Sequence, residues 1–351
     1  MTRFAVHVAC ADAQSIDTFQ LDTGAGALTS GPSLALESKV QCLAMHPEGS
    51  VLYAALATSP PTVRSLTIGG QDGALTPGPD ADLPAGMAYL SVSPAGNALL
   101  GASYNDHLVS VMNLDADGGI LPDTTSTEAP GEHAHAVVIS PDGRFAYATA
   151  LGDDLIVWWT LDPVTSALTN RGQIATPTGS GPRHLRFSPA GDTLYALHEM
   201  SGEIAAYARD AGNGALIEQQ RISSVSPELN LVPGRVRDGS GPEPAANAIW
   251  CAELQVSPDG RFLYSTERSS STIAVVAVGA DGTLALVDTV PTQAQPRGMN
   301  IDPTGGFLLA CGEASGGLTL YAIDPENGGL RERESLDCSA GPRWIEFSPL
   351  T

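Results

Sequence analysis

Short hydrophobic runs separated by turn residues follow one another along this chain, and none keeps a helical period. The stretch 181–220 illustrates the pattern. It contains apolar or alternating runs at 184–187, 194–197, 204–207 and 215–217, separated by turns rich in glycine, proline, serine, asparagine and aspartate. Such runs are typical of β-strands joined by tight turns. One stretch of this kind therefore predicts a sheet of four antiparallel strands.

The turn between the first two expected strands carries a proline followed two residues later by a glycine, and it recurs along the chain. Six complete copies occur, and Ser348-Pro349 starts a seventh. The prolines are Pro47, Pro94, Pro141, Pro189, Pro258, Pro303 and Pro349. Their spacing is 45–48 residues, except for one step of 69. A period of this length in four-stranded units predicts an all-β fold, a seven-bladed β-propeller.

The seventh repeat starts at the end of the chain, and its missing strands are found at the beginning. Residues 4–10 and 16–22 match the second and third strands of a repeat, and 26–29 match the start of the fourth. We therefore expect the last blade to combine N- and C-terminal strands, which leaves no open edge in the ring. The N-terminal apolar run is too short for a signal peptide. We expect residues 1–351 to form one domain.

The one long step between repeats carries about twenty extra residues within 221–250, rich in proline, glycine, serine and asparagine. A long insertion between repeats often projects from the binding face of such a fold. It can equally be a surface loop that the fold tolerates. Both interpretations stay open on the sequence alone.

Composition narrows the class of partner. The chain has 39 acidic and 17 basic residues and a net charge of −22, which opposes binding to nucleic acid or to anionic membranes. No apolar stretch is long enough to span a bilayer. The five cysteines show no CxxC spacing and are interpreted as reduced, mostly buried thiols. These features predict a cytoplasmic protein that acts on a small molecule.

Polar residues recur where the innermost strands are expected to begin. Six residues before the turn proline, three of the repeats carry His135, Arg183 and Arg297. The next position holds His184 and Glu253 in two repeats. Innermost strands of a blade are expected to be short and apolar, so charged groups at their leading ends stand out.

The second strand of each blade runs back to the same face of the ring. Ten residues after the turn proline, this strand is followed by Glu199 and Arg268 in two repeats. Blade geometry therefore gathers six charged or titratable side chains at one mouth: His135, Arg183, Glu199, Glu253, Arg268 and Arg297. A partly dry funnel with such groups suits an anionic ligand and acid–base chemistry. The alternative is that the arginines and carboxylates only pair with one another and with blade-end backbone groups.

Four segments at this mouth carry a resemblance to a known family. They are 133–135 (HAH), 181–185 (GPRHL, with Glu199 following), 257–264 (SPDGRFLY) and 295–298 (QPRG). They resemble the seven-bladed lactonase family, which includes propeller-type 6-phosphogluconolactonases and fungal carboxymuconate cyclases. The resemblance covers essentially the whole chain.

The resemblance implies an active site. In the muconate cyclases of this family, the site contains His, Arg, Glu and Arg, in positions that fall here on His135, Arg183, Glu199 and Arg268. The first two repeats depart from a charged mouth, because they carry small or neutral residues such as Cys42, Met87 and Ala88.

The hypothesis from the sequence is hydrolysis of a small anionic sugar lactone, in the manner of a 6-phosphogluconolactonase. Glu199 is the expected general base and His135 the acid or hydrogen-bond donor, with Arg268 completing the catalytic group. Arginine suits a carboxylate, a phosphate or a developing oxyanion because its planar fork binds such groups in bidentate fashion. The expected substrate-binding residues are His133, Arg183, His184, Glu253 and Arg297. The scheme requires no metal or other cofactor, and we expect none.

Two other functions fit the same residues. A cycloisomerase that opens or closes a muconate-type lactone needs the same arginine clamp and the same proton transfers beside a carboxylate. A non-catalytic propeller that binds a partner is the alternative from another class. A serine or cysteine hydrolase is disfavoured because no GxSxG segment occurs and no cysteine has an adjacent base in the sequence.

Overall fold

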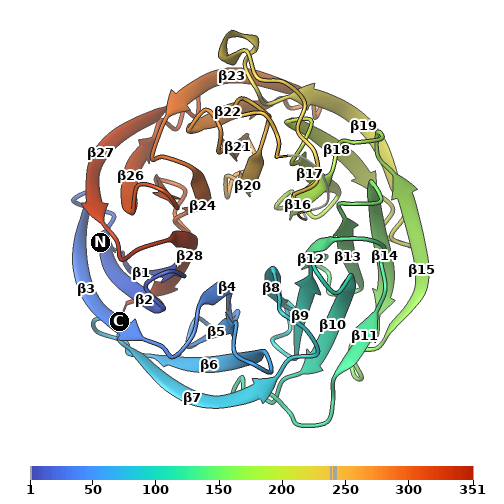
Figure 1. Cartoon of the computed structure of the whole chain (residues 1–351), viewed down its shortest axis with the longest axis vertical. Helices are drawn as coiled ribbons and strands as arrows, with labels where there is room; N and C mark the ends of the chain where they lie inside the picture. Colours follow the sequence, from blue (N-terminus) through green and yellow to red (C-terminus); the bar gives the residue numbers. More distant parts are fainter. Residues whose placement is uncertain (1, 238, 240–242, 351) are drawn as a thin grey trace.

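A computed structural model describes residues 2–237, 239 and 243–350 and shows seven four-stranded antiparallel sheets arranged in a closed ring (Figure 1). The predicted seven-bladed β-propeller is therefore confirmed. The innermost strands surround the centre of the ring, and the fourth strands form its outer edge (Figure 1).

Six blades consist of four consecutive strands, which follow one another from the centre of the ring to its outer edge. The first three are β4 (Val40–Met45), β5 (Val51–Leu56), β6 (Thr62–Ile68) and β7 (Leu75–Asp82); β8 (Tyr89–Val92), β9 (Ala98–Ser103), β10 (Leu108–Asn113) and β11 (Ser126–Glu128); and β12 (Ala134–Ile139), β13 (Phe145–Ala150), β14 (Leu155–Leu161) and β15 (Leu168–Ala175). The next three are β16 (Pro182–Phe187), β17 (Thr193–His198), β18 (Glu203–Arg209) and β19 (Leu216–Ser223); β20 (Cys251–Val256), β21 (Phe262–Glu267), β22 (Thr272–Val278) and β23 (Leu284–Pro291); and β24 (Pro296–Ile301), β25 (Phe307–Gly312), β26 (Gly317–Ile323) and β27 (Leu330–Asp337).

The seventh blade joins the two ends of the chain, as predicted. Its innermost strand β28 (Pro342–Pro349) pairs antiparallel with β1 (Arg3–Cys10), and β2 (Ser15–Asp22) and β3 (Ala27–Ala35) complete the sheet. The buried ring of His7 on β1 reaches both neighbouring strands. Its Nε2 lies 2.9 Å from Oγ of Ser348, and its Nδ1 lies 3.2 Å from Oγ1 of Thr18. Hydrogen bonds therefore join the C-terminal strand to the N-terminal ones inside this blade.

The recurring Ser-Pro-Asp-Gly segment makes a closed turn between the first two strands. In the third blade, Gly143 adopts φ 71°, a left-handed conformation that glycine accepts without strain. Oγ of Ser140 accepts a hydrogen bond of 3.0 Å from the amide of Phe145 and donates one to Asp142. Hydrogen bonds within the turn therefore fix its conformation. The turn pattern in the sequence thus marks where the first strand of each blade ends and the second begins.

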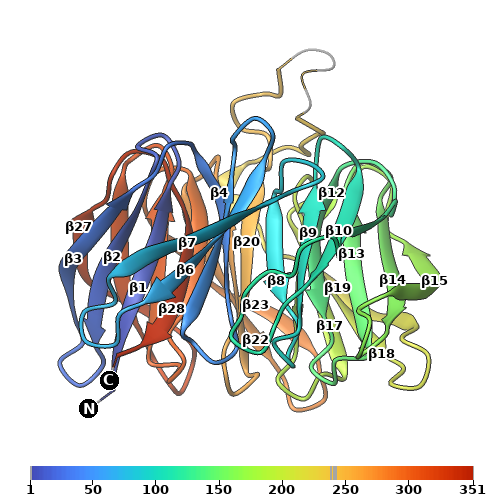
Figure 2. The ribbon, with the colours of Figure 1, turned by 90° about the horizontal axis from the view of Figure 1, so that it is seen from below.

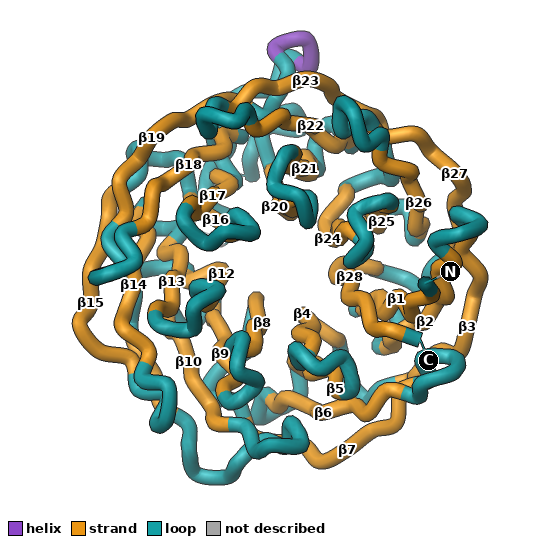
Figure 3. Tube along the Cα trace, turned by 180° about the vertical axis from the view of Figure 1, so that it is seen from behind, coloured by secondary structure: helices purple, strands orange, loops and turns teal. Residues whose placement is uncertain are grey.

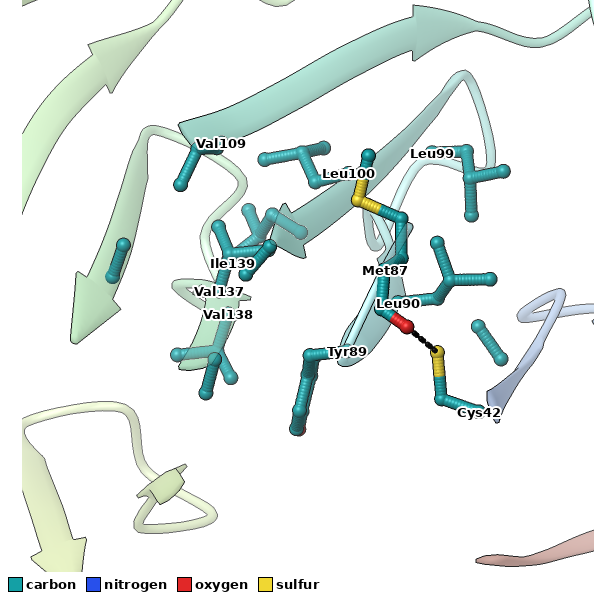
Figure 4. Packing of buried hydrophobic residues seen from close by; sticks show 14 of the residues in the cluster. Cys42, Met87, Tyr89, Leu90, Leu99, Leu100, Val109, Val137, Val138 and Ile139 are labelled. Atoms are coloured by element: carbon teal, nitrogen blue, oxygen red, sulfur yellow. Dashed lines mark hydrogen bonds between the residues drawn. The ribbon is translucent and has the colours of Figure 1, made fainter. Parts of the chain in front are cut away.

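Apolar residues fill the spaces between adjacent blades. Figure 4 shows this packing where Leu100 and Val109 of one blade lie beside Val137 and Ile139 of β12 in the next. Sγ of Cys42 also donates to the carbonyl of Met87 at 3.7 Å, across the boundary with the preceding blade.

Buried tyrosines add polar links between blades. The hydroxyl of Tyr147 donates to the carbonyl of Gly214 at 2.7 Å, and that of Tyr264 donates to the carbonyl of Gly328 at 2.9 Å. In both pairs, the glycine lies in the outer turn of the next blade.

The insertion forms a long connection between β19 and β20. Arg221 belongs to β19, so the loop begins later than predicted, after Ser223. It contains the one helical element of the described chain, the 3-10 helix η1 (Pro227–Leu229) (Figure 3). The loop projects from the end of the ring opposite to the two termini (Figure 2). The same end carries the beginnings of the innermost strands.

Candidate functional site

A cavity of about 300 Å³ opens at the end of the ring where the innermost strands begin. Its lining comes from several blades and from the insertion. Among the described residues, the lining arginines, carboxylates and histidines are His135, Arg183, Glu199, Arg237, Arg268 and Arg297. The predicted gathering of distant charged residues at one mouth is therefore present for five residues, to which the insertion adds Arg237.

A β-bulge in three of the innermost strands turns His135, Arg183 and Arg297 toward the cavity. In β16, the register against β17 shifts between Pro182 and His184, so Arg183 occupies a β-bulge. The strand β24 shifts in the same way around Arg297, and β12 shifts across His135. A bulge bends its strand and turns a side chain away from the regular alternation. The repeats thus present corresponding residues to a common centre.

Glu199 lies between two arginines, directly after the end of β17. Its Oε2 is 2.7 Å from Nε of Arg183 and 3.2 Å from Nη2 of Arg268. All three side chains are buried. Burial lowers the pKa of both guanidinium groups from its usual value, while the charge of Glu199 acts in the opposite direction. Two buried guanidinium groups therefore face one carboxylate oxygen, and Nη2 of Arg268 donates a charge-assisted hydrogen bond to it.

Backbone carbonyls at the start of β20 hold the two arginines in place. Arg268 donates from Nε to the carbonyl of Trp250 at 3.2 Å and from Nη2 to that of Cys251 at 3.3 Å. Arg183 donates from Nη1 to the carbonyl of Ala252. Three successive carbonyls thus position the guanidinium groups before any ligand arrives.

His135 is buried at the edge of the cavity, at the second residue of β12. Within the described part of the chain, its Nδ1 has no hydrogen-bond partner. Burial, followed by the positive charges of Arg183 and other nearby groups, places the pKa of His135 well below its usual value. The imidazole is therefore neutral at physiological pH.

Arg297 lies at the more exposed rim of the cavity and shares a carboxylate with Arg343. Its Nη1 is 3.3 Å from Oε1 of Glu313, while Nη2 of Arg343 is 2.6 Å from the same oxygen. Burial alone would raise the pKa of Glu313, but the two arginines outweigh this and lower it. One carboxylate facing two guanidinium groups leaves this part of the rim positively charged.

His184 and Glu253 are not in the cavity lining, although the sequence placed them among the binding residues. Both are buried behind Arg183. Nε2 of His184 lies 2.9 Å from Nη1 of Arg183, and its Nδ1 lies 2.9 Å from Oε1 of Glu253. The same carboxylate oxygen accepts from Arg186 at 3.0 Å. These two residues contact the site through Arg183.

His133 also lies outside the lining. It precedes β12 with φ 55°, and its ring stacks on Tyr104 with the centroids 4.3 Å apart. Its amide donates to Nδ1 of His107 at 2.8 Å. Tyr104 and the adjacent Asn105 are the residues of this region that line the cavity.

The insertion contributes two lining residues that the sequence analysis did not single out, Arg237 and Trp250. The guanidinium carbon of Arg237 lies 3.9 Å from the centroid of the Trp250 ring, and that of Arg268 lies 3.6 Å from the same centroid. The insertion therefore borders the cavity, which favours the first of its two interpretations. The sequence signal that could have pointed to Arg237 is a basic residue in a proline- and glycine-rich loop of an acidic chain.

Other features of the described residues bear on the class of protein. No group of three or more His, Cys, Asp or Glu side chains among them is arranged to hold a metal ion. All five cysteines are free, and four of them are buried. The helical content of the described chain includes nothing long and apolar enough to cross a membrane.

Comparison with known proteins matches both the sequence and the architecture. Residues 4–347 match the family described as lactonase, 7-bladed beta-propeller. The chain is 31% identical over 350 residues to a 6-phosphogluconolactonase of Cronobacter sakazakii, covering 97% of both proteins. It is 32% identical over 344 residues to a 6-phosphogluconolactonase of Enterobacter sp. (strain 638), again covering 97% of both.

A solved structure supports the fold. The periplasmic gluconolactonase of Pseudomonas aeruginosa superimposes with a TM-score of 0.85 at 24% sequence identity, covering 99% of this chain and 100% of that one. At this identity, the likeness concerns the architecture alone. The sequence matches carry the assignment further, since they span nearly the full length of both partners. The chain therefore belongs to the lactonase family of seven-bladed β-propellers.

Proposed function

We propose that this protein hydrolyses a small anionic sugar lactone, 6-phosphogluconolactone. The observation that carries the proposal is the buried Glu199, held between Arg183 and Arg268 beside the neutral His135 in the cavity. Relatives named 6-phosphogluconolactonase that align over nearly the whole chain support the choice of substrate.

Glu199 is the general base in this proposal. Both arginines approach Oε2, and no described residue donates a hydrogen bond to Oε1. Oε1 of Glu199 is therefore free to accept a proton from the water that attacks the lactone carbonyl. General-base catalysis of this kind typically increases the rate by ~10²–10⁴-fold.

The arginines stabilise the charge that develops on the carbonyl oxygen. Arg183 and Arg268 are held by the backbone at the start of β20, so they need no rearrangement during the reaction. Fixed donors aimed at a developing oxyanion in a water-poor site are an effective source of catalysis. Arg297, at the rim, is a further candidate to bind an anionic group of the substrate.

His135 completes the mechanism at the leaving group. Opening of the ring releases an alkoxide oxygen that must receive a hydrogen bond and then a proton. A neutral imidazole can donate a hydrogen bond to this oxygen, which fits the low pKa of His135. The proton that the oxygen gains is the one that Glu199 removed from the attacking water, so Glu199 returns to the carboxylate and His135 stays neutral.

The proposal is tested by following acid release from freshly prepared 6-phosphogluconolactone above its spontaneous hydrolysis. We expect the wild-type protein to accelerate this reaction, and Glu199→Gln to lower kcat by at least ~100-fold. Glu326→Gln is the matched control, because Glu326 is an exposed residue of the β26–β27 turn at the opposite end of the ring. Circular dichroism verifies that both variants fold.

Two results would overturn the proposal. One is near-wild-type turnover by Glu199→Gln. The other is a wild-type protein that does not accelerate the spontaneous hydrolysis of 6-phosphogluconolactone. In that case, turnover of carboxymuconate, assayed in parallel, identifies a cycloisomerase, and inertness toward both substrates identifies a binding scaffold.

We also place the enzyme in the cytoplasm, which its five free thiols support.

A further inference from the structure

The insertion carries an arginine that the proposed mechanism does not use. Arg237 lines the cavity from the loop between β19 and β20, whereas the proposed reacting groups come from the blades. Its guanidinium group lies over the ring of Trp250, which also lines the cavity. A residue in this position can read a part of the substrate that does not react.

The base of the loop is fixed next to the reacting centre. The amide of Ile249 donates to the carbonyl of Val232 at 2.8 Å, and the amide of Gly234 donates to the carbonyl of Met200 at 2.8 Å. Met200 directly follows Glu199. A Cβ at Gly234 would lie 2.2 Å from the carbonyl oxygen of Ile249, so the backbone packs closely at this point. Arg237 is three residues from this anchored contact.

Trp250 orients the guanidinium group of Arg237. At 3.9 Å and 3.6 Å from one ring centroid, the guanidinium groups of Arg237 and Arg268 have no room on the same face of the indole. They therefore occupy opposite faces. Stacking uses the face of a guanidinium group and leaves the N–H groups at its edge for an anion. The stack links Arg237 through Trp250 to Arg268, which contacts Glu199.

The charges at the mouth leave Arg237 available for a ligand. Arg183 and Arg268 share Glu199, and no described carboxylate lies within ion-pair distance of Arg237. Among the described residues, four arginines and a single carboxylate line the cavity, although the net charge of the chain is −22. This local excess of positive charge suits a substrate with a dianionic group away from its reacting carbonyl.

We propose that Arg237, stacked on Trp250, binds the phosphate of a phosphorylated sugar lactone and makes the enzyme prefer it to the unphosphorylated lactone. The inference rests on the proposed function, since it names the residue that recognises the non-reacting end of that substrate. Arg237 acts here as a specificity residue and takes no part in the proton transfers.

The experiment compares two lactones and two acids. Arg237→Gln should lower kcat/KM for 6-phosphogluconolactone by about ten- to a hundredfold, as expected for the loss of a charge-assisted hydrogen bond. The kcat/KM for glucono-δ-lactone, which lacks the phosphate, should stay unchanged. The matched control is Arg261→Gln, which removes the same charge from an exposed turn between β20 and β21 at the other end of the ring.

Binding measurements make the test independent of turnover. By calorimetry, the wild-type protein should bind 6-phosphogluconate more tightly than gluconate, and Arg237→Gln should lose this difference while Arg261→Gln keeps it. The inference is wrong if Arg237→Gln affects both lactones equally, or if the wild-type protein binds both acids alike. If the wild-type protein hydrolyses neither lactone, the proposed function fails, and the calorimetry alone decides for or against the phosphate site.

Discussion

Nδ1 of His184 lies 2.9 Å from Oε1 of Glu253, and both side chains are buried behind the cavity. Arginine can only donate, so Nε2 of His184 accepts from Arg183 and the ring proton stays on Nδ1, where it is donated to Glu253. Burial keeps the pKa of His184 well below its usual value, in agreement with a neutral ring. Glu253 and His184 thus fix the orientation of the arginine that contacts Glu199.

This relationship predicts that His184 positions Arg183. We expect His184→Phe to lower kcat by about tenfold, because Nη1 of Arg183 loses a buried acceptor that contributes about 1.5–3 kcal/mol. His184→Gln restores an acceptor and should recover part of the activity. Steady-state kinetics and thermal unfolding of both variants provide the measurement. A His184→Phe protein that is folded and retains wild-type kcat would show that the contact is only structural.

A second prediction concerns the protonation of His135. Because burial and neighbouring arginines keep its pKa well below the usual value, the ring should not titrate between pH 5.5 and 8. Histidine NMR spectra recorded across this range should show no protonation shift for His135, with His135→Gln used to assign its signals. A titration midpoint between pH 6 and 7 would contradict the buried, neutral ring.

The same residue should be needed for turnover. His135→Ala removes the proposed donor to the leaving oxygen, so we expect kcat to fall by about 100-fold. His135→Gln keeps an N–H donor in roughly the same place and should lose less. Equal losses in the two variants would indicate that the ring acts by packing and not by donation.

The ring of blades was predictable because its signals are local. A turn such as 140–143 is fixed by bonds within a few residues, and the alternation of each strand reports which side is buried. The antiparallel return of the second strand was enough to bring Glu199 and Arg183 together. The fold, the closure of the ring and most of the charged residues of the lining were therefore predictable from the sequence.

The features of the site that were not predicted from the sequence depend on bulges and loops whose geometry the repeat pattern does not encode. The bulge around Arg183 turns that side chain into the cavity and leaves its neighbour His184 behind it, a distinction that strand alternation does not supply. Arg237 reaches the cavity through an irregular loop anchored at Gly234, and no repeat predicts that contact. Glu253 was predicted at the mouth for the same reason as Arg183, but its side chain is buried behind Arg183 and does not line the cavity.

A fourth prediction uses Glu346 on β28, whose pKa burial raises to about 7 from its usual 4.5. The folded protein then binds this proton more tightly than the unfolded chain, so its contribution to stability is lost as pH rises from about 4.5 to 7. Glu346→Gln keeps the carbonyl that accepts from Nε1 of Trp344. The variant should be more stable than wild type at pH 8 and closely similar at pH 5, as measured by urea unfolding. A gain of equal size at both pH values would rule out titration as its cause.

The last prediction tests the links between blades. The hydroxyl of Tyr264 donates to the carbonyl of Gly328 in the next blade, at the end of the ring away from the cavity. Tyr264→Phe leaves that carbonyl without its donor and should lower the free energy of unfolding by about 1 kcal/mol, with kcat unchanged. Tyr195 occupies the corresponding position on β17, but its hydroxyl has no such bond within the described residues, so Tyr195→Phe is the matched control and should cost less. Equal losses in the two variants would mean that ring packing, and not the hydrogen bond, joins adjacent blades.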